Sequence, residues 1–426
     1  MTLDTQHTID DLAPPERLPF MPGIDGLRAI AVMAVLFYHA EFTWARGGFL
    51  GVEVFFVISG YLITSLLLVE WLRTGTIDLK SFWLRRARRL LPAVFLLLGL
   101  VSLASIFLFR DTVSRMLADV VAALGYVTNW WLIVEDVSYF ESFGRPPLLQ
   151  HLWSLSVEEQ FYVLWPLIFS FGMAMFAFKR RERTIRSFLA LTVVGIVLST
   201  AWMAHLYVPF DDPSRVYYGT DTRAAGILVG VALALVWIPW RLPSRISTVA
   251  GRVLIAGGLA ALVALGWILV VLDEFSPFLY QGGFLVTSLI TAAVIAVTVH
   301  PAIGFGRVLE RQPLKWIGTR SYGIYLWHWP IFMVTRPGFD VSGNPYLLFV
   351  LRTALTFGIA ELSYRLVEAP IRRHGFRTWM GTIRTALGVS SVRGATVMAT
   401  AMLATFVLIG GGLVLGATRP PAVTIA

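Results

Sequence analysis

Long apolar blocks separated by short polar connections follow one another along the chain from about residue 24 onward. Each block approaches the ~20 residues that an α-helix, rising ~1.5 Å per residue, needs to cross the hydrocarbon of a bilayer. A membrane barrel would show ~10-residue alternating strands instead. The pattern therefore predicts an all-α, polytopic integral membrane bundle with about eleven transmembrane helices. The predicted spans are 24–42, 49–70, 91–109, 155–178, 187–206, 222–240, 252–272, 282–299, 321–336, 346–369 and 396–417.

A further block, 113–134, carries Arg115, Asp119 and Asn129, and whether it crosses decides the side of every later loop. Basic residues concentrate in the cytoplasmic loops of membrane proteins. If the N-terminus is cytoplasmic and this block does not cross, most of the 35 Lys and Arg residues fall in cytoplasmic loops. We therefore expect the block to lie in, or re-enter from, the outer face, and the C-terminus to end outside the cell.

Composition supports the membrane class and excludes several others. The chain is 57% hydrophobic and only 14% charged, against about 25% charged in soluble domains. The net charge of +9 comes from short loops, which indicates topology and anionic lipid rather than nucleic acid. The absence of cysteine excludes thiolate chemistry, and the seven histidines lack metal-ligand spacing, so we expect no metal site and no bound cofactor.

The order of these segments predicts one membrane domain with short appendages. We expect a cytoplasmic tail over 1–21, a ten-helix membrane domain over 22–372 and a basic cytoplasmic linker over 373–395. An eleventh helix over 396–417 and an outer tail over 418–426 would follow. The first 20 residues have no apolar core, so we expect no cleaved signal peptide.

Ionisable residues inside apolar spans are costly and usually functional, and the first span carries two of them. Arg28 and His39 are eleven residues apart, which places them on one face of a helix about 16 Å apart. Each also has a plain interpretation. Arg28 fits an interfacial anchor that extends its charge to water, and His39 fits a hydrogen-bonded helix-packing residue.

Carboxylates stand near the outer ends of two other spans. Glu53 opens the second span and is close in sequence to His39, although an exposed carboxylate at a helix end fits it equally. Glu158 and Glu159 follow Ser154 and Ser156, a pattern that is also typical of an N-cap with acidic residues in the first turn. Adjacent residues point ~100° apart on a helix, so at least one of the two glutamates should face the bundle.

A basic cluster precedes the third span on the predicted cytoplasmic side. Arg85, Arg86, Arg88 and Arg89 follow one another within a single helical turn or so, and guanidinium groups bind phosphates through two parallel hydrogen bonds. A topology signal that binds anionic lipid is the plain alternative. Further polar candidates are Ser154, Asp221, Arg223, Tyr325 and His328, although the aromatic residues of 321–336 also fit an interfacial belt.

Several ordered motifs between about residues 22 and 372 together resemble the acyltransferase-3 family of bacterial membrane O-acyltransferases. Position 53 departs from the family by having Glu where Asp is frequent. Relatives with an eleventh span usually carry an SGNH-type domain after it, so the chain resembles the membrane domain of that subgroup. The motifs are Gly-Ile-Asp-Gly-Leu-Arg at 23–28 with His39 eleven residues beyond Arg28, and the segments 51–64, 82–92, 152–166, 222–226, 321–330 and 367–370.

The resemblance implies a multi-pass enzyme of the bacterial inner (cytoplasmic) membrane. Such an enzyme would transfer an acyl group, most often acetyl, from cytoplasmic acyl-CoA to a hydroxyl of a cell-envelope glycan or glycolipid outside. Acyl-CoA would be a co-substrate rather than a bound cofactor. A hydroxyl is a poor nucleophile at neutral pH, and a neutral histidine is well matched to act as its base.

Roles for particular residues follow from this implied chemistry. His39 would be the base or a transient acyl carrier, and Glu159, or else Glu158 or Glu53, would orient it. Arg28 would bind the donor along its path into the bundle. The phosphates of CoA would be bound by Arg85, Arg88 and Arg89.

A transporter or flippase that moves a charged or lipid-linked substrate is the alternative from another class. Intramembrane Arg, His and Glu fit that activity equally well. It does not predict an arginine cluster at the cytoplasmic mouth of the bundle, and it does not account for the ordered family motifs.

Overall fold

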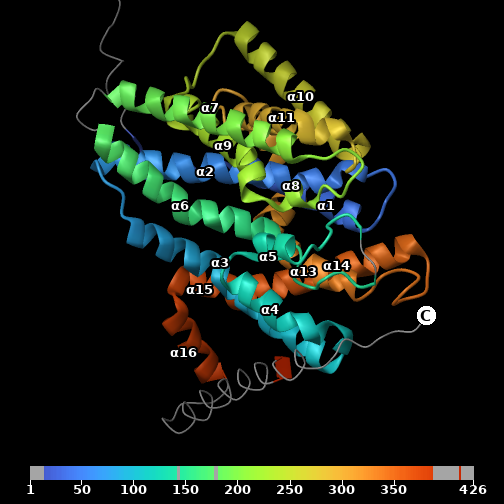
Figure 1. The fold of residues 1–426 in the computed structure, drawn as a ribbon. Helices are drawn as coiled ribbons and strands as arrows, with labels where there is room; N and C mark the ends of the chain where they lie inside the picture. Colours follow the sequence, from blue (N-terminus) through green and yellow to red (C-terminus); the bar gives the residue numbers. More distant parts are fainter. Residues whose placement is uncertain (1–13, 142–143, 177–180, 387–411, 414–426) are drawn as a thin grey trace, which may run out of the picture. The chain divides into compact units, whose positions relative to one another are not determined.

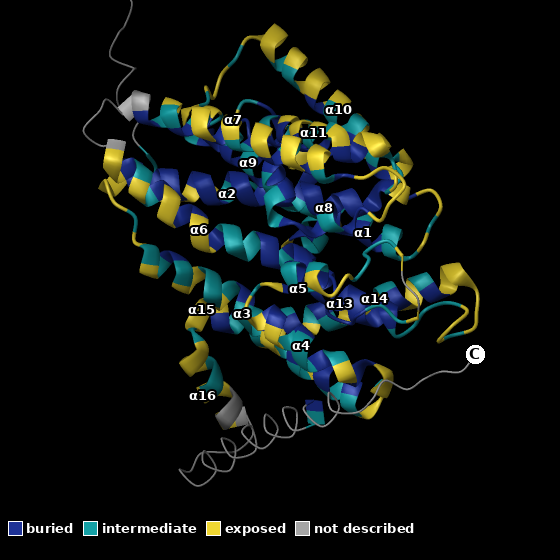
Figure 2. Cartoon of the chain, in the orientation of Figure 1, coloured by how far each residue is buried: buried dark blue, intermediate teal, exposed yellow. Residues whose placement is uncertain are grey.

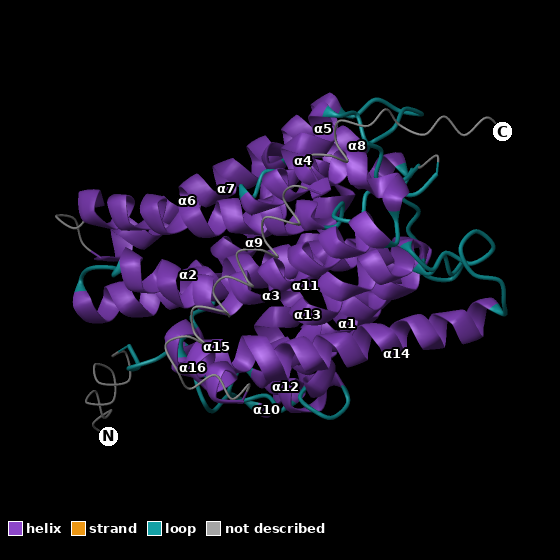
Figure 3. Ribbon diagram, turned by 90° about the horizontal axis from the view of Figure 1, so that it is seen from below, coloured by secondary structure: helices purple, strands orange, loops and turns teal. Residues whose placement is uncertain are grey.

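A computed structural model describes residues 14–141, 144–176, 181–386 and 412–413. Within these ranges the regular elements are helices, apart from one isolated bridge between Pro337 and Val341 (Figure 3). Seven of the helical segments are long and apolar enough to cross a membrane. The predicted all-α membrane bundle is therefore confirmed. The seven segments are Arg46–Thr74, Leu79–Phe107, Thr184–Leu206, Thr220–Arg241, Thr248–Val271, Leu279–Thr298 and Pro345–His374.

Three more predicted spans also form helices. These are α1 (Pro22–His39), α6 (Leu152–Phe176) and α13 (Leu314–Met333). The eleventh predicted span, 396–417, lies outside the described residues except for Gly412 and Leu413. The number eleven, and the division of the chain into tails, membrane domain and linker, stay predictions.

Local sequence signals account for the ends of several helices. The Asn344 side chain accepts hydrogen bonds from the backbone N–H groups of Tyr346 and Leu347, and Pro345 occupies the first position of α14. Both features are favourable at a helix N-terminus, where backbone donors lack partners. At the other end of a helix, α2 stops at Gly75, whose φ of 72° is a left-handed conformation that glycine adopts without strain.

The chain divides into two compact units, of which the first comprises Met1–Leu79, Ser138–Phe140 and Val157–Ser321. In this unit α2 is the central helix. In the most apolar 18-residue stretch of the segment that contains α2, 83% of the residues are buried, whereas only 17% are buried in the corresponding stretch of α10 (Figure 2). We interpret α10 as a lipid-facing helix. The elements of this unit are α1, η3 (Arg46–Leu50), α2 (Gly51–Thr74), most of α6, α7 (Arg181–Leu206), α8 (Ser214–Tyr218), α9 (Thr220–Val236), η5 (Pro239–Arg241), α10 (Thr248–Val271), η6 (Leu279–Gly283), α11 (Phe284–Thr298) and α12 (Phe305–Leu309).

Glycines allow the backbones of α2 and α9 to pack closely against each other. The two helices run side by side, and α7 lies next to α9 (Figure 1). A Cβ atom on Gly60 would lie 1.9 Å from the carbonyl oxygen of Ile227, and one on Gly230 would lie 2.1 Å from that of Val57. Small residues at such crossings favour helix association in membranes because they permit close packing. The α2–α9 contact thus holds the polar residues of both helices in fixed register.

The second unit comprises Lys80–Val137, Glu141–Ser156 and Tyr322–Ala426. Here the ambiguous block 113–134 breaks into two helices, of 12 and 7 residues. Neither is long enough to cross ~30 Å of hydrocarbon, so the block does not form one spanning helix, as the charge pattern predicted. The elements of this unit are α3 (Leu79–Phe107), η4 (Arg110–Thr112), α4 (Val113–Leu124), α5 (Thr128–Val134), most of α13, α14 (Pro345–Ser363), η7 (Tyr364–Glu368), α15 (Ala369–His374) and α16 (Phe376–Ala386).

Polar residues of the 113–134 block are used for contacts within it. The buried carboxylate of Asp119 accepts hydrogen bonds from Arg115 Nε and from Trp131 Nε1, both at 3.0 Å. These contacts join α4 to α5 across the break between them. The charge of Asp119, which is unfavourable in a spanning helix, is thereby paired with Arg115 inside the unit.

Candidate active site

His39 is the last residue of α1, and its half-buried ring contacts a tyrosine from a distant segment. The Nε2 atom of His39 lies 3.0 Å from Oη of Tyr139. Tyr139 is itself held by its backbone N–H, which donates to Oγ of Ser214 at 2.7 Å. The phenol is therefore fixed at the nitrogen that a general base would use.

A second tyrosine extends this contact into the interior of the first unit. Tyr217, on α8, packs against Tyr139, and the two ring centroids are 4.6 Å apart. Burial raises the pKa of the Tyr217 phenol above its usual value, although the charge of Arg223 partly opposes this. Tyr217 thus stays protonated at neutral pH and remains able to donate a hydrogen bond.

Arg223 links Tyr217 to a fully buried ion pair. Its guanidinium lies 5.0 Å from the ring centroid of Tyr217 and 3.9 Å from that of Phe284. Its Nη2 donates to Glu53 Oε2 at 2.6 Å, and Glu53 Oε1 accepts from Ser288 Oγ at 2.5 Å. The Arg223 and Glu53 side chains are only 0% and 2% exposed. Buried charges are tolerated when they are paired in this way and the remaining donors find partial compensation on aromatic faces.

The space for this ion pair depends on a glycine, which has no Cβ atom. A Cβ atom on Gly226 would lie 2.0 Å from Glu53 Oε1. Gly226 stands three residues after Arg223 on α9, so one turn of that helix supplies both the guanidinium and the space for its partner. The pair thereby ties α2, α9 and α11 together beneath Tyr217.

The position of Glu53 corrects one interpretation of the sequence. The side chain is not an exposed carboxylate at a helix end, because α9 and α11 cover it. Its two oxygen atoms contact Arg223 and Ser288, so the structure gives it these partners rather than His39. Sequence reasoning could not foresee this, since Arg223 is 170 residues away along the chain.

The N-cap interpretation of Ser154 and Ser156 is also wrong. Helix α6 begins at Leu152, so both serines lie inside the helix, and Ser156 Oγ donates to the carbonyl of Leu152 and accepts from the backbone N–H of Thr128. Glu158 is consequently beyond the first turn of α6.

Glu158 belongs to a polar contact between α6 and α2. Its Oε1 accepts from Ser59 Oγ at 2.8 Å, and Ser59 in turn accepts from Tyr162 Oη at 2.9 Å. Glu159 is the next residue of α6 and is half-exposed. Its pairing with His39 stays a prediction.

Arg28 lies on the same continuous helix as His39, as the spacing predicted. Its Nη1 is 4.0 Å from Asp25 Oδ1, and its side chain is 15% exposed. The guanidinium also lies 5.9 Å from the ring centroid of Phe55 on α2. Arg28 is thus partly paired and packed against the bundle, and its role in donor binding stays a prediction.

Arg85, Arg88 and Arg89 lie on α3 in the second unit, within the helix rather than in a loop before it. The structure therefore corrects their predicted setting, because α3 begins at Leu79. Arg85 and Arg88 are exposed, whereas Arg89 is half-exposed. Residues three positions apart share a helix face, so Arg85 and Arg88 present their charges to solvent together.

Ser154, Tyr325 and His328 come together inside the second unit. Ser154 Oγ lies 2.6 Å from Tyr325 Oη, which also donates to the carbonyl of His151 at 3.0 Å. His151 Nε2 donates to the carbonyl of Leu326 at 3.0 Å, and the ring centroids of His151 and His328 are 6.0 Å apart. The cluster joins α6 to α13 mainly through backbone carbonyl groups, as expected of helix-packing contacts.

Asp221, another candidate, lies in an ion pair at the start of α9. It accepts from Arg215 Nη2 and from Trp202 Nε1, both at 2.8 Å. These contacts hold α7 and α8 against the N-terminus of α9. A carboxylate so placed also interacts favourably with the helix dipole, which is sufficient reason for its presence.

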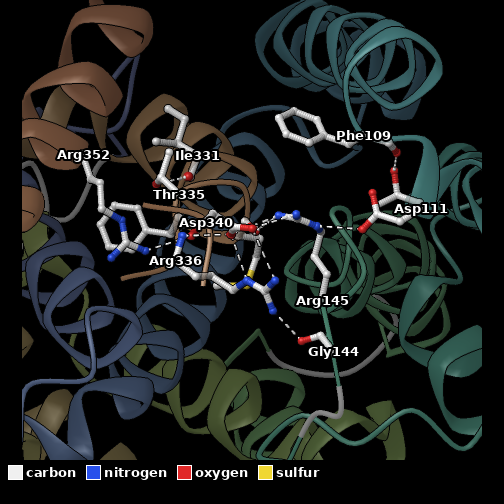
Figure 4. Close-up of polar contacts among 12 residues, drawn as sticks. Phe109, Asp111, Gly144, Arg145, Ile331, Thr335, Arg336, Asp340 and Arg352 are labelled. Atoms are coloured by element: carbon white, nitrogen blue, oxygen red, sulfur yellow. Dashed lines mark hydrogen bonds and ion pairs between the residues drawn. The ribbon is translucent and has the colours of Figure 1, made fainter. Parts of the chain in front are cut away.

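An ion-pair network in the second unit escaped the sequence reasoning (Figure 4). Arg145 Nε donates to Asp111 at 3.0 Å and its Nη2 donates to Asp340 at 2.9 Å, while Arg336 Nε also donates to Asp340 at 3.0 Å. Partial burial opposes ionisation of Asp340, but the hydrogen bonds from Arg336 and then Arg145 hold its pKa at about 2. Because a lowered pKa stabilises the folded state above that pH, the network persists until the pH falls toward about 2.

The residues of this site that sequence reasoning missed are Tyr139 and Tyr217, on the side of His39, and Ser288, beside Glu53. Tyr139 lies in a connecting segment, where pattern carries little information. A signal for Ser288 does exist, because Thr287, Ser288 and Thr291 give the apolar helix α11 one polar face. Among the described residues no group of His, Asp and Glu side chains is arranged to hold a metal ion.

The fold and these contacts define a polytopic membrane protein with a histidine–tyrosine pair next to a buried ion pair. The profile of the acyltransferase domain family matches residues 21–365, and the chain therefore belongs to this family, acyltransferase-3. It is 44% identical over 357 residues to the peptidoglycan O-acetyltransferase OatA of Listeria monocytogenes, a match that covers 84% of this chain and 56% of the relative.

Other relatives agree with this assignment. The putative peptidoglycan O-acetyltransferase YrhL of Bacillus subtilis is 44% identical over 361 residues, covering 84% of this chain and 56% of the relative. A putative O-acetyltransferase of Staphylococcus aureus is 41% identical over 362 residues, covering 85% and 59%. The chain thus spans little more than half the length of these relatives. No solved structure shows significant similarity to it.

Proposed function

We propose that the chain is a membrane O-acyltransferase that transfers an acyl group, most simply acetyl, from acyl-CoA to a hydroxyl of a cell-envelope glycan such as peptidoglycan. Membership of the acyltransferase-3 family supports the reaction class, and the names of the relatives support the acceptor. The single observation that carries the proposal is the 3.0 Å contact between His39 Nε2 and Tyr139 Oη. It places a hydroxyl at a histidine nitrogen, as general-base catalysis requires.

In the proposed reaction His39 removes the proton from the acceptor hydroxyl. The acceptor oxygen bonds to the thioester carbonyl carbon, the carbon–sulfur bond breaks, and the proton passes from Nε2 to the departing CoA thiolate. In the two-step form, Nε2 bonds to the thioester carbonyl carbon as the carbon–sulfur bond breaks and CoA leaves as its thiolate. The acceptor oxygen then bonds to that carbon, the bond from the carbon to Nε2 breaks, and the acceptor proton passes to the thiolate. Tyr139 contacts Nε2 before the reaction, and the acceptor hydroxyl or the acyl group takes its place at that nitrogen; Tyr217 packs against the Tyr139 ring.

Donor binding is assigned to the predicted cytoplasmic side. Arg85 and Arg88, with Arg89 beside them, bind the phosphates of acyl-CoA through charge-assisted hydrogen bonds. Arg28 binds further along the donor path, about 16 Å from His39 at the rise of an α-helix. Glu159, the favoured orienting carboxylate for His39, completes the proposed set.

The proposed setting is the bacterial cytoplasmic membrane, with the N-terminus inside and the C-terminus outside. The positive-inside distribution of Lys and Arg supports this orientation. His39, at the C-terminal end of the first span, then lies near the outer face where a glycan acceptor is available.

A transfer assay tests the proposal directly. The chain is reconstituted in proteoliposomes and given radiolabelled acetyl-CoA together with soluble peptidoglycan fragments. We expect the label to become ester-linked to the glycan. Movement of the fragments across the membrane without ester formation would favour a transporter instead.

A further inference from the structure

A row of aromatic rings leads away from the proposed catalytic histidine within the first unit. The centroid of His39 is 6.2 Å from that of Tyr139, Tyr139 is 4.9 Å from Phe140, and Phe140 is 5.8 Å from Phe275. Each of these spacings lies in the range over which aromatic rings contact one another. The four rings therefore form one continuous row, which we call the aromatic row.

The outer part of this row lies outside the membrane-spanning segments. Phe275 stands in the connection between Thr248–Val271 and Leu279–Thr298, and it is 43% exposed. Tyr139 and Phe140 are half-exposed and lie in the connection between α5 and α6. Aromatic residues that anchor a protein at the bilayer surface are mainly Trp and Tyr, whose polar atoms bond to headgroups. Phe140 and Phe275 have no such atom, so anchoring does not account for them.

A carboxylate accompanies the exposed end of the row. Glu274 directly precedes Phe275. The carboxyl is half-buried, and burial raises its pKa above the usual value, while Arg46 acts in the opposite direction. An apolar ring with a hydrogen-bond acceptor beside it matches a ligand that has apolar C–H faces and a rim of hydroxyl and amide donors.

We propose that Tyr139, Phe140 and Phe275, together with Glu274, form the subsite that binds the acceptor glycan. A sugar ring packs its C–H face on the exposed ring of Phe275, and Glu274 accepts hydrogen bonds from the sugar's hydroxyl or amide groups. The row directs a neighbouring hydroxyl toward His39. This inference rests on the proposed function, because it assigns the acceptor of that same reaction.

Steady-state kinetics with soluble peptidoglycan fragments as the varied substrate test the subsite. We expect Phe275→Ala to raise the KM for the fragments about tenfold, as the loss of one aromatic contact implies. The KM for acetyl-CoA and kcat should stay within twofold, because Phe275 does not contact the donor or the base. Phe275→Trp should restore the low KM, whereas a role in local folding would not distinguish Ala from Trp in this way.

The control is Phe210→Ala, since Phe210 is an exposed phenylalanine in another connection of the first unit. Its KM for the fragments should equal that of the unsubstituted chain. An unchanged KM in Phe275→Ala, or an equal rise in Phe210→Ala, would overturn the subsite. Failure of the unsubstituted chain to transfer acetyl at all would instead overturn the proposed function, so the two failures are distinguishable.

Discussion

At the scale of single residues, His39 is the residue to which the sequence assigns the central chemical role, as a base or acyl carrier. Its position at the end of α1 and its contact with Tyr139 fit a base that acts on a hydroxyl near the membrane surface. The partner of its Nε2 atom is a phenol from a segment 100 residues away, and the pairing of His39 with Glu159 stays a prediction.

Replacing His39 tests this role most directly. His39→Ala should lower acetyl transfer by at least about 100-fold, which is typical of losing a general base, while acetyl-CoA still binds. The measurement is single-turnover transfer of radiolabelled acetyl to peptidoglycan fragments, with donor binding followed by calorimetry.

His205→Ala is the matched control, because His205 is an exposed histidine in the last turn of α7. It should transfer acetyl at the normal rate. Near-normal turnover in a folded His39→Ala protein would contradict the mechanism and move the search to Glu159 and His328.

At the scale of elements, the buried Glu53–Arg223 pair joins helices that are far apart in sequence. Removing one partner leaves the other charge buried and unpaired, which costs about 3–5 kcal/mol. Glu53→Ala should therefore lower the thermal unfolding temperature in detergent strongly, whereas Glu53→Ala combined with Arg223→Met should recover much of the loss.

Ser288→Ala is the control for these variants, because it removes one hydrogen bond to Glu53, worth about 1 kcal/mol, and leaves the Glu53–Arg223 pair in place. If the effects of Glu53→Ala and Arg223→Met simply add, the two side chains are not energetically coupled, and the pair does not support the site.

The exposed face of α3 carries the second prediction at this scale. Arg85→Ala combined with Arg88→Ala should weaken acetyl-CoA binding by about 2–4 kcal/mol, because each loses a charge-assisted contact to phosphate. Binding is measured by calorimetry in nanodiscs.

The control is Arg373→Ala combined with Arg377→Ala, which removes two exposed arginines of another predicted cytoplasmic segment. It should leave donor affinity unchanged. Equal weakening in both double variants would show a general effect of charge, and the α3 arginines would then be topology signals only.

At the scale of the whole molecule, the orientation in the membrane is open to a simple test because the chain has no cysteine. Glu141→Cys should react with an impermeant thiol reagent added outside intact cells. Glu182→Cys should react only after the cells are made permeable. The opposite pattern would invert every loop assignment, and the unsubstituted chain gives the background.

Most of the fold could be predicted because membrane insertion depends on local properties of the chain. The length and apolarity of a block decide whether it can span hydrocarbon, and the distribution of Lys and Arg indicated that 113–134 does not cross. Loops were harder to interpret, since segments such as 138–140 and 272–276 have no period that indicates their contacts.

The sequence by itself determined the membrane class, the helical architecture and the family, because each depends on local pattern or ordered motifs. Only the tertiary structure decided which polar groups meet. Glu53 contacts Arg223 and Ser288 across 170 and 235 residues, and no local property of the chain encodes such distances. The physical reason is that buried polar groups must find partners, whereas the choice of partner depends on how the helices pack.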